Sequence, residues 1–279
     1  MQFFLLGAGK PVKGLKPASL QKVALGTRAL DWQLHSVSSI LKKEDIHFLG
    51  GYYANEINFL YPELNITYIP DWEHGGPLKT LLHAPFDKKE CLITYSDTIF
   101  RKELIEGFCS VDADVVVGID TKWQERYERR TESDISNAET IELVNDVVEF
   151  TGLLKLSARA VSIISEVDSN YVGASLVNLI SLLKALGMSV EYFDVAGNWA
   201  EFNSPNDVAH FVLGTKAETL ARLEGVVAKS VIGKQVSFTT REWKTERSNI
   251  LSKIHNEFEA EALVIRSSSK GEDNWYASN

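Results

Sequence analysis

The sequence predicts an α/β fold in which a mostly parallel sheet is covered on both faces by helices. Short apolar runs alternate along the chain with segments of helical periodicity, and this alternation is typical of β–α units. The first apolar run leads directly into a glycine turn, and ligands of such sheets bind at the carboxyl ends of the strands. At 279 residues the chain can hold one large domain, or a domain of about 200 residues with a smaller piece.

The expected strands are short apolar runs, at 3–6, 46–49, 66–69, 91–95, 115–119 and 190–194. Helical periodicity lies between them, at about 29–42, 77–84, 101–107, 158–166 and 173–186. Gly7 and Asp97 each follow one of the strands. Because the carboxyl ends of parallel strands meet at one edge of a sheet, both residues are expected at the ligand-binding edge.

Two segments depart from this rhythm. Residues 120–150 carry dense charge and aromatic side chains, and we expect an excursion over the site there; a solvated face is the alternative for most of them. After about residue 210 amphipathic helices follow, within 214–232 and 241–261, and then a strand at 262–266. A second unit is therefore expected to begin near residue 210.

Composition excludes several classes of protein. The net charge of −9 argues against non-specific nucleic-acid binding, which needs a basic surface. Cys91 and Cys109 show no metal-ligand spacing and are expected as buried or half-buried thiols, which suits a reducing compartment. The apolar run at the start is too short for a secretory signal, and no run approaches the roughly 20 residues of a membrane span. We expect a soluble, cytoplasmic protein with neither nucleic-acid nor membrane partners.

The glycine turn Gly7-Ala8-Gly9 is the first candidate site. Backbone N–H groups of such a turn can approach an anion, and nearby lysines can neutralise it. The lysines that follow the turn are Lys10, Lys13, Lys16 and Lys22. Neither G-x-G-x-x-G nor G-x-x-x-x-G-K-[ST] fits the spacing. The turn is thus a candidate phosphate site, with an ordinary strand-to-loop turn as the alternative.

Residues 8–13 resemble the opening of the nucleotidyltransferase superfamily, roughly A-G-x-G-x-R followed by P-K, with Gln21-Lys22 at the second part. Pro11 replaces the second glycine and Lys13 the arginine; a proline has no N–H to offer a phosphate. The resemblance is to MobA-like proteins and to sugar-phosphate and phosphonate cytidylyltransferases, and it implies a Rossmann-like nucleotidyltransferase fold over residues 1–210. It also implies nucleotide contacts at Leu6, Gly7, Ala8, Gly9 and Lys10, with Lys13 and Lys22 as catalytic cations.

Acidic residues at a strand end form the second candidate site. Asp97 follows the 91–95 strand, where a carboxylate can hold a divalent cation against a triphosphate; a helix N-cap is the alternative. The segment from Trp199 resembles the superfamily's W-x-E-I-D-x-x-x-D motif. The resemblance implies a Mg²⁺ site made by Asp97, Glu201 and Asn203, with catalytic Asp97 and with Ser96 against the nucleotide. Asn203 stands where the motif has an aspartate and supplies no charge, so Glu201 or Asp207 would compensate.

The resemblance implies two further subsites. Gly75, Gly76 and Leu78 would enclose the base, with an ordinary loop as the alternative. The residues implied for the acceptor are Lys122, Trp123, Tyr127, Arg130, Glu139 and Gly152. Lys122 or Arg130 could pair with the acceptor's phosphate.

A second resemblance begins at Ala262. Residues 262–273 are similar to the V-R-S-S-A-x-x-E-D segment of the ATP-grasp domain in pyruvate phosphate dikinase and phosphoenolpyruvate synthase, whose arginine contacts ATP phosphates. The resemblance implies that residues 211–279 comprise linker helices and the truncated start of a kinase domain. The chain would then be the front part of a bifunctional polypeptide with a fused downstream kinase.

These observations predict a Mg²⁺-dependent nucleotidyltransferase. It would join a nucleoside monophosphate, with CTP the favoured donor, to a phospho-amino acid, phosphoramidate, phosphonate or sugar phosphate, release pyrophosphate, and serve synthesis of capsular or other surface polysaccharides. The resemblance allows a homo-oligomer. One rival is a non-catalytic nucleotide-sensing or scaffolding domain, motivated by Pro11 and Asn203; another makes the kinase-like tail the active part.

Overall fold

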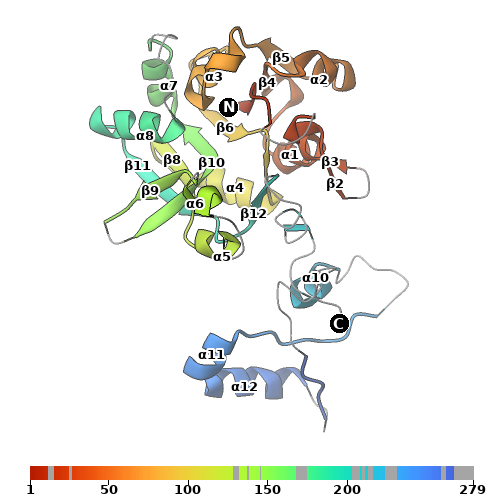
Figure 1. Ribbon diagram of the computed structural model, residues 1–279. Helices are drawn as coiled ribbons and strands as arrows, with labels where there is room; N and C mark the ends of the chain where they lie inside the picture. Colours follow the sequence, from red (N-terminus) through yellow and green to blue (C-terminus); the bar gives the residue numbers. More distant parts are fainter. Residues whose placement is uncertain are drawn as a thin grey trace. The chain divides into compact units, whose positions relative to one another are not determined.

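The computed structural model describes most of the chain. The described residues are 1–11, 16–24, 27–127, 132–136, 138–144, 146–167, 175–202, 208, 211–212, 216–223, 231–258 and 262–266. The chain divides into two compact units, Met1–Val208 and Ala209–Asn279, whose elements can be followed by colour in Figure 1.

A mixed, mostly parallel sheet runs through the first unit. Its strands lie in the order β11 (Val190–Asp194), β8 (Val115–Asp120), β10 (Val147–Leu156), β6 (Cys91–Tyr95), β1 (Gln2–Gly7), β4 (Ile46–Gly50) and β5 (Asn65–Tyr68). The pairs along this path are parallel except those of β10, which is antiparallel to β6, to β8 and to the short β9 (Thr140–Glu142). The predicted fold class is therefore confirmed, and all six expected strands are present.

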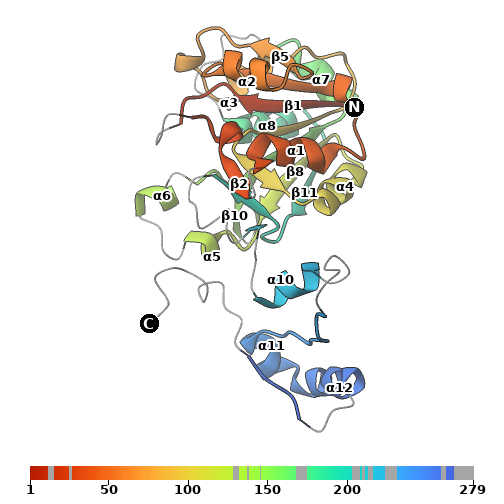
Figure 2. The ribbon, with the colours of Figure 1, turned by 90° about the vertical axis from the view of Figure 1, so that its right-hand side faces the viewer.

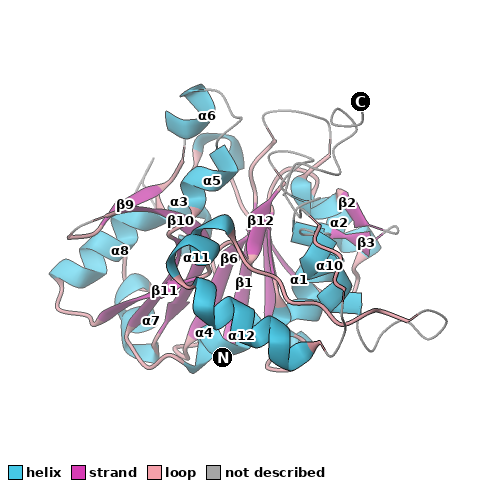
Figure 3. Ribbon diagram, turned by 90° about the horizontal axis from the view of Figure 1, so that it is seen from below, coloured by secondary structure: helices cyan, strands magenta, loops and turns pink. Residues whose placement is uncertain are grey.

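Helices cover both faces of this sheet (Figure 3). The helices that cover it are α1 (Ala29–Val37), α2 (Ala54–Leu60), α3 (Pro77–Leu82), α4 (Lys102–Ser110), α7 (Ala158–Ile164) and α8 (Leu176–Ala185). Two further short helices, α5 (Trp123–Tyr127) and α6 (Glu132–Ser136), follow β8. α1 and α4 lie side by side on one face (Figure 2). The helix expected over 29–42 ends at Val37, where the Ser38 hydroxyl donates to the carbonyl of His35 and so satisfies a group of the last turn.

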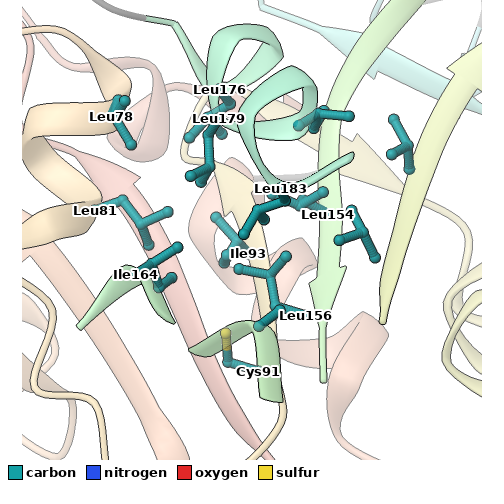
Figure 4. Close-up of a cluster of buried hydrophobic side chains, with 14 of the residues drawn as sticks. Leu78, Leu81, Cys91, Ile93, Leu154, Leu156, Ile164, Leu176, Leu179 and Leu183 are labelled. Carbon is teal, nitrogen blue, oxygen red and sulfur yellow. The ribbon is translucent and has the colours of Figure 1, made fainter. Parts of the chain in front are cut away.

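The hydrophobic core has two layers because successive strand residues point to opposite faces. In β1, Phe4 and Leu6 belong to the layer under α3, α7 and α8, which Figure 4 shows, whereas Phe3 and Leu5 belong to the layer under α1, α2 and α4. All six residues of β1 are buried. A strand buried on both faces reads as a continuous apolar run, which is why this element was recognisable in the sequence.

The sequence pattern does not predict the longest strand, β10. Its apolar run is interrupted by Glu149 and Lys155, which are nevertheless buried. Tyr127 donates a hydrogen bond to the Glu149 carboxylate (2.6 Å), and Lys155 Nζ donates to the carbonyls of Cys109 (2.9 Å) and Val111 (2.6 Å) at the end of α4. Polar groups satisfied by distant partners can be buried at low cost, and sequence periodicity does not reveal such partners.

An irregularity in the middle of β10 depends on Gly152. The register with β8 shifts between Phe150 and Leu154, and Gly152 has φ +75°, a left-handed conformation that favours glycine. A Cβ at this position would lie 2.5 Å from the ring of Tyr95 on β6. Gly152 thus lets β10 approach the Tyr95 ring.

The second unit contains three described helices, α10 (Lys216–Leu223), α11 (Thr240–Thr245) and α12 (Arg247–Glu257). α11 begins with a capping box between Thr239 and Glu242. The prediction of a strand at 262–266 is wrong. These residues are exposed and form no strand, because no strand in the described part of the chain pairs with them. The rest of the ATP-grasp-like motif, residues 267–273, lies outside the described residues.

The two cysteines have the burial that the sequence predicts. Cys91 is buried, Cys109 is half-buried, and both thiols are free. Within the described ranges, no helix has the length and apolar character needed to cross a bilayer.

Replacing Gly152 with alanine should destabilise the protein by about 2–4 kcal/mol, because the left-handed φ and the contact with Tyr95 both oppose a side chain. Gly187 provides the matched control, since it has φ +80° but open space around a new Cβ. Gly187→Ala should cost only about 1 kcal/mol. Urea denaturation of both variants checks this expectation, and equal losses would show that the Tyr95 contact contributes nothing.

Candidate functional site

Asp97 lies in a turn at the carboxyl end of β6. The turn leads into β7 (Thr98–Phe100), which pairs with β12 (Trp199–Glu201) so that Thr98 lies opposite Glu201. The N–H of Phe202 donates to the carbonyl of Asp97 (2.9 Å). The alternative that Asp97 is a helix N-cap is wrong, because α4 begins after β7 with Arg101 at its cap. The turn instead brings Asp97 and Glu201 together from residues far apart in the chain.

The turn is adjacent to the glycine turn that follows β1. β1 and β6 are parallel neighbours with Leu6 opposite Tyr95, and the N–H of Ser96 donates to the carbonyl of Leu6 (3.0 Å). Ser96 is itself buried. The candidate phosphate site and the candidate cation site therefore lie at neighbouring strand ends.

The carboxyl group of Asp97 is held in an unfavourable environment. Asp97 is half-buried, and its Oδ1 is a buried atom with no hydrogen-bond partner within the described part of the chain. Burial, followed by the negative charges of Glu201 and Glu139, raises the pKa of Asp97 to about 7. A buried carboxylate oxygen without a donor is the kind of group that a cation would compensate.

Glu139 joins this acidic cluster from the loop before β9. Tyr95 donates a hydrogen bond to its carboxylate (2.6 Å), and the ring of Tyr95 packs edge-on against Phe150. Burial raises the pKa of Glu139; the hydrogen bond from Tyr95 opposes this rise, and the charge of Glu201 adds a smaller increase. Sequence reasoning gave Glu139 a role towards the acceptor, and the structure brings it within electrostatic reach of Asp97 and Glu201.

The carboxylates of the acidic cluster, Asp97, Glu201 and Glu139, are oxygen ligands of the kind that Mg²⁺ takes. Among the described residues no group of three His, Cys, Asp or Glu side chains forms a ready-made metal cage. Mg²⁺ commonly takes only one or two carboxylates and completes its shell with phosphate oxygens and water. The unpartnered oxygen of Asp97, with Glu201 nearby, meets that requirement. Asn203 lies outside the described residues.

The glycine turn itself is open on one side. Gly7 ends β1 with its α-carbon packed against the ring of Phe48, so a side chain would not fit there. Ala8 is buried, and its carbonyl accepts a hydrogen bond from the N–H of Tyr52 (2.9 Å). Gly9 and Lys10 are exposed.

The predicted catalytic lysines are only partly described. Lys13 lies outside the described residues. Lys22 is exposed on β2 (Lys22–Ala24), which pairs with β3 (Thr27–Arg28) just before α1. The structure thus leaves Lys22 accessible from solvent.

Aromatic side chains that sequence reasoning missed lie beside the glycine turn. Tyr52 contacts the rings of Tyr53 (4.6 Å between centroids) and Trp72 (5.6 Å), and Lys10 lies over Tyr52, 5.7 Å from its centroid. Tyr53 and Asp71 have positive φ, 58° and 50°, although neither is a glycine. Such strained residues often occur at functional sites. The sequence signal that could identify these aromatic residues is their position directly after the strands β4 and β5.

The three residues predicted to enclose the base differ in position. Gly75 is exposed, and Gly76 is the N-cap residue of α3. Leu78 is buried in the core against α8, as Figure 4 shows. The side chain of Leu78 therefore serves packing, and the accessible part of this segment is the glycine pair.

The residues predicted to contact the acceptor also differ in exposure and in distance from the acidic cluster. Trp123 and Tyr127 are buried, and Trp123 Nε1 donates to the carbonyl of Val147 (2.9 Å). The Tyr127 hydroxyl, as described above, donates to Glu149. Lys122 is exposed, while Arg130 lies outside the described residues. Of this set, Glu139 is close to the acidic cluster, and Gly152 contacts it indirectly through the Tyr95 ring.

Solved structures resemble the chain although sequence comparisons do not: no family model and no curated protein matches it. The inositol-1-phosphate CTP transferase from T. maritima matches with 16% identity and TM-score 0.55, covering 74% of this chain and 90% of its own. A putative glucose-1-phosphate thymidylyltransferase from Bacillus anthracis has 14% identity and TM-score 0.55, with coverage of 84% and 97%. HddC from Yersinia pseudotuberculosis, complexed with GMP-PN, has 14% identity and TM-score 0.53, with coverage of 75% and 96%. The chain has the fold of nucleotidyltransferase structures.

Replacing Asp97 with asparagine should stabilise the metal-free protein at pH 8. A carboxyl whose pKa is about 4 when unfolded and about 7 when folded loses stability as pH rises from 4 through 7. The stability of the variant relative to wild type should therefore rise by at most about 3 kcal/mol between pH 5 and pH 8, since this window covers about two pKa units of the shift at about 1.4 kcal/mol each. Denaturation with urea at both pH values measures the gain. Glu63→Gln, which replaces an exposed acid outside the cluster, is the control. The expectation is contradicted if the stability of wild type and of both variants changes equally between the two pH values.

Proposed function

We propose that the first unit is a Mg²⁺-dependent nucleotidyltransferase, which joins the nucleoside monophosphate of a nucleoside triphosphate to a small phosphorylated acceptor. The observation that supports this most is the adjacency of the glycine turn and Asp97, linked by the Ser96-to-Leu6 hydrogen bond (3.0 Å). A triphosphate on the glycine turn would present its oxygens to the cation site. The fold and the acidic cluster agree with this assignment.

The chain's residues would act chiefly by positioning and by neutralising charge. N–H groups of the glycine turn and the exposed Lys10 would hold the triphosphate, and Lys13 and Lys22 would offset charge in the transition state. An oxygen of the acceptor phosphate attacks the α-phosphorus; the bond between the α-phosphorus and the bridging oxygen breaks, and pyrophosphate leaves with that bond's electron pair. When bound by Asp97 and Glu201, Mg²⁺ would neutralise the negative charge of the phosphates.

CTP is the donor we favour, on the resemblance in the sequence and on the CTP transferase among the similar structures. Two other similar structures are a glucose-1-phosphate thymidylyltransferase and HddC complexed with GMP-PN, so proteins of this fold differ in the nucleotide that they take. We place the base between the Gly75-Gly76 pair and the rings of Tyr52 and Trp72. This side of the glycine turn offers both accessible backbone and aromatic surface.

The acceptor would lie on the opposite side, near Glu139. A raised pKa allows that carboxyl to keep its proton at higher pH than an exposed one, so that it can donate a hydrogen bond to an acceptor hydroxyl. We propose a phospho-amino acid, phosphoramidate, phosphonate or sugar phosphate, activated in the cytoplasm for surface polysaccharide synthesis. The ATP-grasp-like segment at 262–273 supports a kinase in the same polypeptide that would phosphorylate the acceptor.

The second candidate is a nucleotide-sensing or scaffolding domain that binds without turnover. Pro11 favours it, because a proline just after the glycine turn, where the superfamily motif has its second glycine, offers no N–H to a phosphate. The two candidates differ in whether bound nucleotide releases pyrophosphate in the presence of an acceptor.

Calorimetric titration of CTP, UTP, ATP and GTP, with and without Mg²⁺, should identify one nucleotide that binds tighter when Mg²⁺ is present. Asp97→Ala should lose that enhancement and abolish pyrophosphate release on a panel of phosphorylated acceptors, while binding nucleotide as wild type does without Mg²⁺. Glu63→Gln should behave as wild type, and circular dichroism checks that both variants fold. Full activity of Asp97→Ala would overturn the proposal, and binding without turnover on any acceptor would favour the second candidate.

A further inference from the structure

Gln33 on α1 reaches the Asp97 turn from the helical layer beneath it. The side chain is only 2% exposed, and its Nε2 donates hydrogen bonds to the carbonyls of Tyr95 (2.8 Å) and Thr98 (2.5 Å). These two carbonyls stand on either side of Ser96-Asp97. A single amide group therefore joins both ends of the turn that carries the candidate cation ligand.

The carbonyl oxygen of the Gln33 side chain, Oε1, indicates that stability alone does not explain a glutamine at this position. Oε1 is buried and has no hydrogen-bond partner among the described residues. An unsatisfied buried oxygen is unfavourable, and an apolar side chain of similar shape would avoid it. Turning the amide over would place Oε1 against two carbonyl oxygens, so the observed orientation is fixed. The two donated hydrogen bonds are what an apolar residue would lack.

The effect of Gln33 extends to the second carboxylate. Thr98, whose carbonyl Gln33 binds, lies opposite Glu201 in the β7–β12 pair, and Phe202 donates its N–H to the carbonyl of Asp97. Asp97 and Glu201 are thus carried by one small assembly that α1 holds from below. The hydroxyls of Thr94 and Thr98 hydrogen-bond to each other within it (2.9 Å).

α1 is joined to the phosphate side of the site as well. The N–H of Ala29, at the start of α1, donates to the carbonyl of Gln21 (2.9 Å), next to Lys22. The same helix therefore connects the strand of a predicted catalytic lysine with the turn of a predicted metal ligand. Movement of the turn relative to α1 would alter the distance between cation and triphosphate.

We propose that Gln33 is a positioning residue, which sets the separation of Asp97 and Glu201 by fixing the Tyr95–Thr98 turn on α1. This inference rests on the proposed function and adds to it a residue that touches neither nucleotide nor metal. Residues that orient metal ligands typically change metal affinity by about 10–100-fold when they are replaced. Loss of the Gln33 amide should therefore weaken cation binding without weakening nucleotide binding.

The test compares Gln33→Met, which keeps the volume but not the donors, with Ser36→Ala. Ser36 is buried on the same helix, and its hydroxyl donates to the carbonyl of Gln33 within the helix. Gln33→Met should raise the Mg²⁺ concentration for half-maximal pyrophosphate release about tenfold and lower kcat. The KM for the nucleotide and its binding without Mg²⁺ should not change. Ser36→Ala should match wild type in each of these quantities.

The inference is overturned if Gln33→Met has the same Mg²⁺ midpoint and the same kcat as wild type. This holds even if the variant is less stable than wild type. If wild type itself neither binds nucleotide with Mg²⁺ nor releases pyrophosphate, the proposed function fails. The inference is then decided by hydrogen exchange of the Ser96 and Phe202 amides, which pin the turn. Faster exchange in Gln33→Met than in Ser36→Ala supports the fixing of the turn, and equal exchange overturns it.

Discussion

β1 and β6 run parallel in the middle of the sheet, with Leu6 opposite Tyr95 and the N–H of Ser96 bound to the Leu6 carbonyl. This pairing decides where the two chemically distinctive turns lie. The glycine turn leaves one strand at the same edge at which the Asp97 turn leaves the other. Their adjacency follows from backbone hydrogen bonds, which hold side chains of residues about 90 positions apart in a fixed relation.

The carboxylates at this edge are held in place at the expense of local stability. Asp97 keeps an unsatisfied buried oxygen, and its charge is opposed by Glu201 and Glu139. Two apolar layers, on opposite faces of the sheet, provide the stability that such a site lacks. Concentrating like charges in this way is useful only if a cation or a proton compensates them, which is why the acidic cluster points to function.

β10 contributes to the site through a contact between its backbone and the ring of Tyr95. Gly152 allows the strand to approach the Tyr95 ring, and the hydroxyl of that tyrosine holds Glu139. A backbone conformation available to glycine thereby influences the position of a carboxylate in another segment. Gln33 acts on Asp97 from the opposite face of the sheet, so the cluster is oriented by both layers of the protein.

The sequence by itself determined the positions of the main strands and the fold class. Continuous apolar runs such as 3–6 mark strands buried on both faces, and the alternation with helices implies a mostly parallel sheet. It also placed Asp97 and the glycine turn at strand ends. Local patterns are sufficient for these inferences because burial and periodicity are properties of neighbouring residues.

Only the tertiary structure decided which of the candidate residues meet. Glu139 joins Asp97 and Glu201, whereas Leu78 and Trp123 turn into the interior, and residues 262–266 form no strand. The role of Gln33 had no local signal, since a glutamine on a helix is ordinarily a surface residue. Strand register and the hydrogen bonds of buried polar groups link residues far apart in the chain, and periodicity within one segment contains no information about a partner in another.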